Sequence, residues 1–106
     1  MQREDPADRR FVKYEKMKEL LDLEETFPTE FTYKFIGQNS ALFKEGIAAW
    51  FAEWSAQYPT FKMLTERESA GGAHLALTYT FRAPSSDVII AIFRAIEKIP
   101  DIRIVL

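Results

Sequence analysis

Two segments of the sequence alternate between apolar and polar residues, and this alternation limits the folds open to the chain. Residues 30–37 and 73–82 place large apolar side chains at every second position. A period of two predicts strands that bury one face and leave the other face polar. The inward side chains are then Phe31, Tyr33 and Phe35 in the first strand, and Leu75, Leu77, Tyr79 and Phe81 in the second.

Three other segments follow the helical period. Residues 9–22, 40–58 and 87–99 repeat apolar side chains at steps of three and four, with charged residues between them. The stripe on the second segment is wide, and the third segment is apolar around much of its circumference. Pro59 and Pro100 end these two helices, because the residue before a proline is disfavoured in the helical conformation.

Two weaker strands complete the pattern. Residues 60–69 precede a Gly71-Gly72 turn, which predicts a hairpin with the strand over residues 73–82. Near the C-terminus, Ile102 and Ile104 occupy alternate positions. They predict a last strand in which both isoleucines face the core.

The order of elements from residue 30 defines the fold class. Strand, helix, strand, strand, helix and strand form the split βαβ arrangement. Right-handed crossovers then place both helices on one face of an antiparallel sheet with strand order 4-1-3-2. We therefore expect an α+β, ferredoxin-like sandwich with an extra N-terminal helix. Residues 1–29 would hold a polar tail over residues 1–8, that helix and a linker, and residues 30–106 would form the folded domain.

Composition excludes several functional classes. The 106 residues include no cysteine, so disulfides, thiol catalysis and cysteine-based zinc sites are absent. The N-terminus has no apolar signal region, and no apolar run is long enough to span a membrane. A formal net charge of −2 argues against binding to nucleic acid, which requires many phosphate-neutralising lysines and arginines. We expect a cytoplasmic protein that acts without nucleic acid or membrane.

No set of residues forms a catalytic signature, and we expect no cofactor and no metal site. His74 is the only histidine, and it has neither a second histidine nor an obvious carboxylate partner. An exposed strand position is the simpler interpretation of such an isolated residue. Trp50 and Trp54 lie four residues apart, which would suit an aromatic platform but is more typical of a helix stripe packed in the core.

The turn Gly37-Gln38-Asn39-Ser40 is the predicted ligand-binding site. It connects the first strand to the start of a helix, where free backbone N–H groups and the helix dipole favour an anion or a carboxylate. The alternative is a capped helix start that binds nothing, because every helix needs such a cap.

The sequence also resembles the YbeD-like family of uncharacterised small bacterial proteins over residues 18–106. The resemblance rests on FPTEFTYKFIG at Phe27–Gly37, on the Ser69-x-x-Gly72 turn and on the terminal IRIVL. It implies a ferredoxin-like fold similar to the ACT domains that sense small molecules, and a regulatory role connected with lipoate metabolism. The chain differs from the family in its longer, charged N-terminal extension and in His74, where the family tends to have tyrosine.

These observations favour a non-enzymatic binding or regulatory domain that senses a small metabolite or contacts a partner protein. The ACT comparison implies a homodimer, with the ligand near residues 37–40. The first alternative is a small acylphosphatase-like hydrolase that uses Arg82 or Arg103. The second is an interaction module whose N-terminal helix docks on a partner protein.

Overall fold

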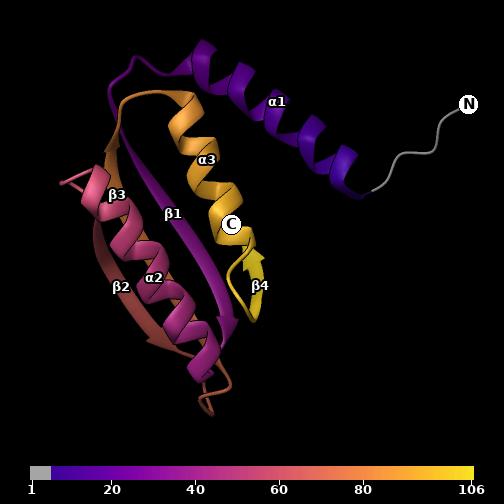
Figure 1. Cartoon of the computed structure of the whole chain (residues 1–106), viewed down its shortest axis with the longest axis vertical. Coiled ribbons are helices and arrows are strands. Elements are labelled where there is room, and N and C mark those ends of the chain that lie inside the picture. The colour runs from indigo at the N-terminus through magenta and orange to yellow at the C-terminus, as the bar shows by residue number, and fades with distance from the viewer. Residues whose placement is uncertain (1–5) are drawn as a thin grey trace, which may run out of the picture.

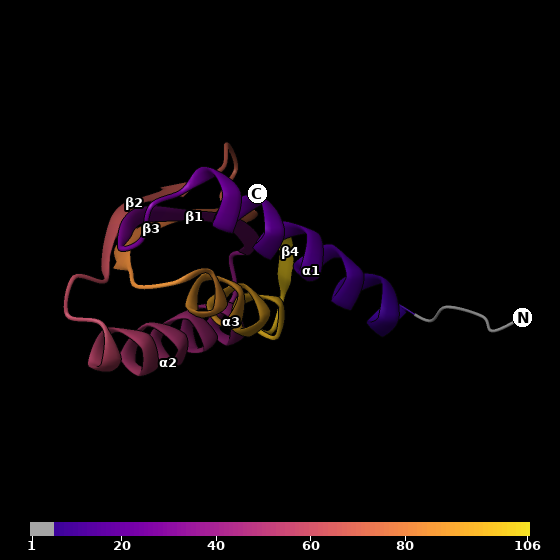
Figure 2. The same ribbon diagram turned by 90° about the horizontal axis from the view of Figure 1, so that it is seen from above.

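Four strands form one antiparallel sheet, and two helices cover one of its faces (Figures 1 and 2). The computed structural model describes the backbone of residues 6–106 and the side chains of residues 13–106. The elements are α1 (Pro6–Glu24), β1 (Thr29–Gln38), α2 (Ala41–Gln57), β2 (Lys62–Glu68), β3 (His74–Ala83), α3 (Ser86–Glu97) and β4 (Ile102–Val105). The sheet order β2-β3-β1-β4 confirms the predicted 4-1-3-2 arrangement.

The central pair of strands, β1 and β3, forms the floor of the core. Phe31 lies opposite Phe81, Tyr33 opposite Tyr79, and Phe35 opposite Leu77, so the predicted inward residues share one face. Tyr33 and Phe35 are completely buried. The hydroxyl of Tyr33 donates a hydrogen bond of 3.0 Å to the carbonyl oxygen of Ile89, which satisfies a polar group that burial would otherwise penalise.

Helix α2 covers this floor with its aromatic stripe. Trp50 is 4% exposed, and its ring packs edge-on against Phe35 and Tyr79, with centroids 5.4 and 5.0 Å apart. Trp54 lies at the border of the stripe and is partly buried against the core. The two tryptophans therefore belong to the packing of α2 on the sheet, which agrees with the core interpretation of their spacing.

The prediction for the last strand was wrong at Ile104. The pairing of β4 with β1 shifts register between Ile36 and Gly37, so that Ile102 lies opposite Gly37 and Ile104 opposite Ile36. A bulge of one residue reverses the side on which the following side chains emerge. Ile104 is consequently 50% exposed on the open face, whereas Val105 packs against the core.

Helix α1 begins earlier than the sequence predicts. The predicted tail covers residues 1–8; its first five residues lie outside the described residues, and the other three already belong to α1. The helix packs on α3, with Tyr14 3% exposed and Met17 and Leu21 partly buried against the core. Figure 2 shows α1 beside α3, with its first turns extending past the rest of the domain.

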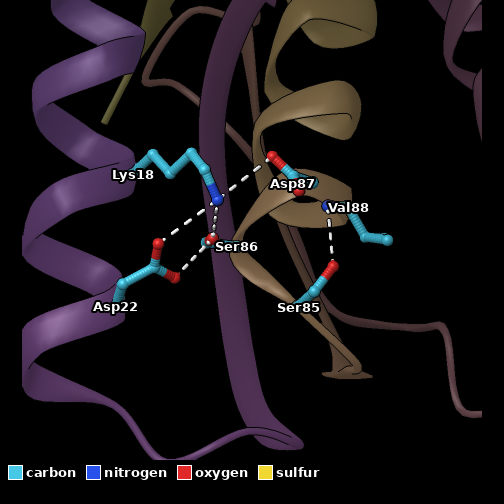
Figure 3. Close-up of polar contacts among 6 residues, drawn as sticks. All are labelled: Lys18, Asp22, Ser85, Ser86, Asp87 and Val88. Carbon is cyan, nitrogen blue, oxygen red and sulfur yellow. Dashed lines mark hydrogen bonds and ion pairs between the residues drawn. The ribbon is translucent and has the colours of Figure 1, made fainter.

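A polar cluster joins α1 to the first turn of α3 (Figure 3). The ammonium group of Lys18 lies 3.2 Å from Asp22 Oδ2, 3.2 Å from Ser86 Oγ and 3.3 Å from Asp87 Oδ1. Ser86 Oγ donates a hydrogen bond of 2.6 Å to Asp22 Oδ1. Beside it, Ser85 caps α3 by accepting a hydrogen bond from the N–H of Val88.

These contacts predict that the docking of α1 depends on pH. The hydrogen bonds from Ser86 and Lys18 hold the pKa of Asp22 below its ordinary value. A carboxyl group with a lowered folded-state pKa contributes stability above its unfolded pKa, and this contribution disappears as pH falls through the folded pKa. At pH 7 we expect Asp22→Asn to be less stable than the wild type, and we expect this difference in unfolding free energy to shrink toward zero at acid pH.

Chemical denaturation at a series of pH values from neutral to 2.5 measures this difference. Glu19→Gln, an exposed carboxylate change on the same helix, is the matched control and should leave the pH dependence of stability unchanged. A constant gap between the wild type and Asp22→Asn at every pH would contradict the assignment.

Candidate functional site

The turn after β1 is held by contacts within the chain. Gly37 is buried, and a Cβ atom at this position would overlap the ring of Phe43. Phe43 is itself fully buried in the first turn of α2. Glycine is therefore required here so that the start of the helix can approach the end of the strand.

Ser40 brings a carboxylate of the same chain to the start of α2. Its Oγ accepts a hydrogen bond of 3.1 Å from the N–H of Phe43 and donates one of 2.6 Å to Asp101 Oδ2. Asp101 also accepts a bond from the N–H of Gln38 through its backbone carbonyl. The helix start thus holds a carboxylate, a group that its N–H groups and dipole favour, and this carboxylate belongs to the chain itself.

Asn39 connects the same turn to the β2–β3 hairpin. Its side-chain amide donates to the carbonyl of Gly72 at 3.0 Å and to Glu68 Oε1 at 3.3 Å, and its backbone N–H donates to Ala73. The backbone N–H groups of residues 38, 39 and 40 all have partners within the chain. The ligand site at Gly37, Gln38, Asn39 and Ser40 stays a prediction, and their clearest role in the structure is to join three loops.

A Gly37→Ala substitution tests how tightly this junction is packed. We expect it to lower the unfolding free energy by about 1–3 kcal/mol, the usual cost of overfilling a packed core. In a Phe43→Leu background, which removes the obstructing ring, the same glycine change should cost measurably less. Urea denaturation of the four proteins gives the coupling, and strict additivity would show that Phe43 does not restrict position 37.

The open face of the sheet carries a pocket of about 400 Å³, which we call the sheet-face pocket. Its apolar lining is Ile36, Ala76 and Ile104, and its basic lining is Arg67, His74 and Arg103, with Glu68 and Ser69 completing the wall. Helices α2 and α3 lie against the opposite face of the sheet (Figure 2).

Strand pairing places four of these side chains in one row across the sheet. Arg67 of β2 lies opposite Ala76 of β3, Ala76 lies opposite Ile36 of β1, and Ile36 lies opposite Ile104 of β4. Residues that lie directly opposite in a sheet share a face. The row therefore runs from the guanidinium group of Arg67 on the edge strand β2 to Ile104 on the edge strand β4, and Ala76 and Ile36 lie between them.

Arg103 supplies a second guanidinium group at the end of this row. It lies at the β4 bulge, and its Nη2 donates a hydrogen bond of 2.8 Å to the side-chain oxygen of Gln38. This bond links the predicted turn to the sheet-face pocket. The carboxylate of Glu68 accepts a hydrogen bond from Asn39, so one of its oxygens is already engaged.

The pocket combines residues that the sequence predicts with residues that it does not. The alternation that points Phe35, Leu75 and Ile102 inward leaves their neighbours Ile36, Ala76 and Arg103 for the open face. His74 is exposed at the start of β3, as expected. Arg67 and Ile104 were missed. Every residue of β2 is exposed, so no alternation in burial reveals its faces, and the β4 bulge has no sequence signal.

The pocket lining offers two guanidinium groups, one imidazole group and an apolar floor. Among the residues that the structure describes, no group of three or more histidine or acidic side chains is arranged to hold a metal ion. Of the two arginines considered for acyl-phosphate chemistry, Arg103 contacts the turn, whereas Arg82 lies on β3 opposite Glu30 of β1, at the other end of the sheet. Over residues 6–106, no helix is both long and apolar enough to cross a membrane.

The fold is a small α+β sandwich of the ferredoxin-like class with an additional helix. Residues 23–106 match the family described as "Protein of unknown function (DUF493)", and the chain belongs to this family. The resemblance to the YbeD-like proteins is thereby confirmed.

Two relatives support the assignment. A UPF0250 protein of Ralstonia nicotianae is 31% identical over 80 residues, which cover 76% of this chain and 81% of the relative. A UPF0250 protein of Paraburkholderia phytofirmans is also 31% identical over 80 residues, covering 76% of this chain and 89% of the relative. No solved structure matches the chain.

Proposed function

We propose that this protein is a cytoplasmic, non-enzymatic regulatory domain that binds a small organic anion with an apolar chain in the sheet-face pocket. The observation that carries the proposal is the row formed by Arg67, Ala76, Ile36 and Ile104, with Arg103 beside it. Two guanidinium groups next to an apolar floor suit a ligand that has a carboxylate at one end and methylene groups behind it.

Charge supports this ligand class. The chain has a formal net charge of −2, yet the pocket lining contains two arginines and a histidine against a single acidic residue. Guanidinium groups bind carboxylates through paired, charge-assisted hydrogen bonds. The protein as a whole therefore repels anions weakly, while this pocket attracts them.

The apolar floor supports a ligand with a chain. Each methylene group removed from water contributes roughly 0.8 kcal/mol, so a ligand of several carbons gains more from the two isoleucines than acetate does. Medium-chain acids such as octanoate and lipoate fit this description. The family resemblance to lipoate-related regulatory proteins favours the same class.

The position of the pocket also supports a regulatory role. Arg67 comes from β2 and Ile104 from β4, the two edge strands of the sheet. A ligand that contacts both residues links the two edges to the central strands. It thereby stabilises β4, which is only four residues long.

Amide chemical-shift titrations of the full chain test the proposal. The probes are octanoate, lipoate, free amino acids, acetate, which lacks the chain, and octanamide, which lacks the charge. We expect octanoate and lipoate to shift the amides of Ile36, Ala76 and Ile104, and acetate and octanamide to bind at least tenfold more weakly. Shifts confined to residues 37–40 would favour the turn, and no shift at either place with any probe would overturn the proposal.

Substitution of the two arginines gives the second test. Arg67→Gln and Arg103→Gln should each weaken octanoate binding by roughly 10- to 100-fold, as expected for one charge-assisted hydrogen bond of about 1.5–3 kcal/mol. Arg82→Gln is the matched control, because Arg82 lies on β3 far from the pocket and should leave binding unchanged. Equal loss in all three variants would indicate a non-specific effect of charge.

An assay with an acyl phosphate separates this proposal from the hydrolase alternative. We expect no release of phosphate above the uncatalysed rate. Turnover that Arg103→Gln abolishes would replace the binding proposal with the catalytic one.

A further inference from the structure

Helix α1 has a second apolar surface that its docking on α3 does not cover. Leu20 is 58% exposed and Leu23 is 81% exposed, although Met17 and Leu21 beside them pack against the core. Leu20 lies in a groove of about 510 Å³ that runs along the described part of the helix. Most of α1 also precedes the region that matches the family, which begins at residue 23.

The charges along this groove follow a definite order. Lys13 and Lys16 line the end nearer the N-terminus, Glu24 and Glu25 line the other end, and Leu20 lies between them. A groove that is basic at one end and acidic at the other is complementary to itself when one copy is reversed. An antiparallel second copy places its glutamates against these lysines and its lysines against these glutamates.

The apolar residues of α1 fit the same antiparallel, two-fold arrangement. A two-fold axis at Leu20 brings Leu20 against its own copy, and it brings Met17 opposite Leu23 of that copy. Lys16 then lies opposite the copy's Glu24. The charge pairs thus surround an apolar centre, the arrangement found in small protein interfaces.

The helix dipole gives an independent reason for this pairing. Glu24 is the last residue of α1 and Glu25 follows it, and the last turn contains no basic residue. Negative charges are unfavourable at the C-terminal end of a helix, where the carbonyl groups carry partial negative charge. The lysines of an antiparallel copy would neutralise this end of α1.

We propose that α1 forms an antiparallel contact with α1 of a second copy, centred on Leu20 and closed at each end by Lys13 and Lys16 against Glu24 and Glu25. The segment from Lys13 to Glu25 is about 18 Å long at 1.5 Å per residue. So short an overlap buries less area than a permanent dimer needs. The dimer is therefore weak and depends on salt.

The outer edge of β2 is another surface on which a second copy could dock. Its register shifts between Met63 and Thr65, and it carries the charged residues Lys62 and Arg67. Bulges and charges on an edge strand oppose the addition of another strand. This objection concerns the addition of a strand, so it does not apply to the exposed face of the helix α1.

Charge reversal with mixing tests the proposal on the full chain. One variant carries Lys13→Glu and Lys16→Glu, and the other carries Glu24→Lys and Glu25→Lys. Sedimentation velocity at low salt should show a concentration-dependent dimer for the wild type. It should show at least tenfold weaker association for each variant alone and recovered association for an equimolar mixture. Wild-type association should also weaken in 0.5 M salt.

A control variant with Lys44→Glu and Lys62→Glu changes the net charge as much as the first variant does but leaves α1 untouched, and it should associate like the wild type. Circular dichroism of each variant shows whether α1 remains folded, and Leu20→Gln provides an uncharged disruption of the same interface. The proposal is overturned if the wild type is monomeric at millimolar concentration. It is also overturned if both charge-reversed variants associate like the wild type, or if their mixture fails to recover.

Discussion

The burial of aromatic rings between the central strands and the helices is the interaction on which the rest of the structure depends. Tyr33 stands at its centre, with ring contacts to Trp50 of α2, Phe81 of β3 and Phe93 of α3. Its hydroxyl must find a partner because it is buried, and it finds one in the Ile89 carbonyl of α3. Burial of Tyr33 also raises the pKa of that hydroxyl, which keeps it neutral.

The position of α3 then fixes where two other segments of the chain contact the domain. Its first turn receives α1 through the cluster of Lys18, Asp22 and Ser86. Its other end leads to Asp101, whose carboxylate accepts a hydrogen bond from Ser40 at the start of α2. The loop after α3 is thus one of the three that meet around Gly37, together with the turn after β1 and the β2–β3 hairpin. With one face of the sheet covered by helices, the open face remains for the sheet-face pocket.

Two strands could be predicted well because burial on one side imposes a period of two on their residues. In β1 and β3 every expected inward residue lies on the covered face. The same reasoning failed at Ile104, because the one-residue bulge turns this side chain to the open face. In β2 every residue is exposed, so there is no alternation in burial from which to assign the two faces. The motif at residues 37–40 correctly marked a capped helix start. The partner of that cap, Asp101, lies 61 residues away from Ser40 and has no local signal.

The sequence by itself determined the number and order of the elements in the folded domain, the class of the fold and the inward residues of its two central strands. Periodicity and proline or glycine breaks act locally, so they can be read along the chain. Only the tertiary structure decided which side chains meet across the sheet and which face of α1 stays exposed. Arg67, Ile36 and Ile104 form one row because hydrogen bonds and bulges between distant strands set the register. That register depends on pairs of residues far apart in the chain, which no single segment encodes.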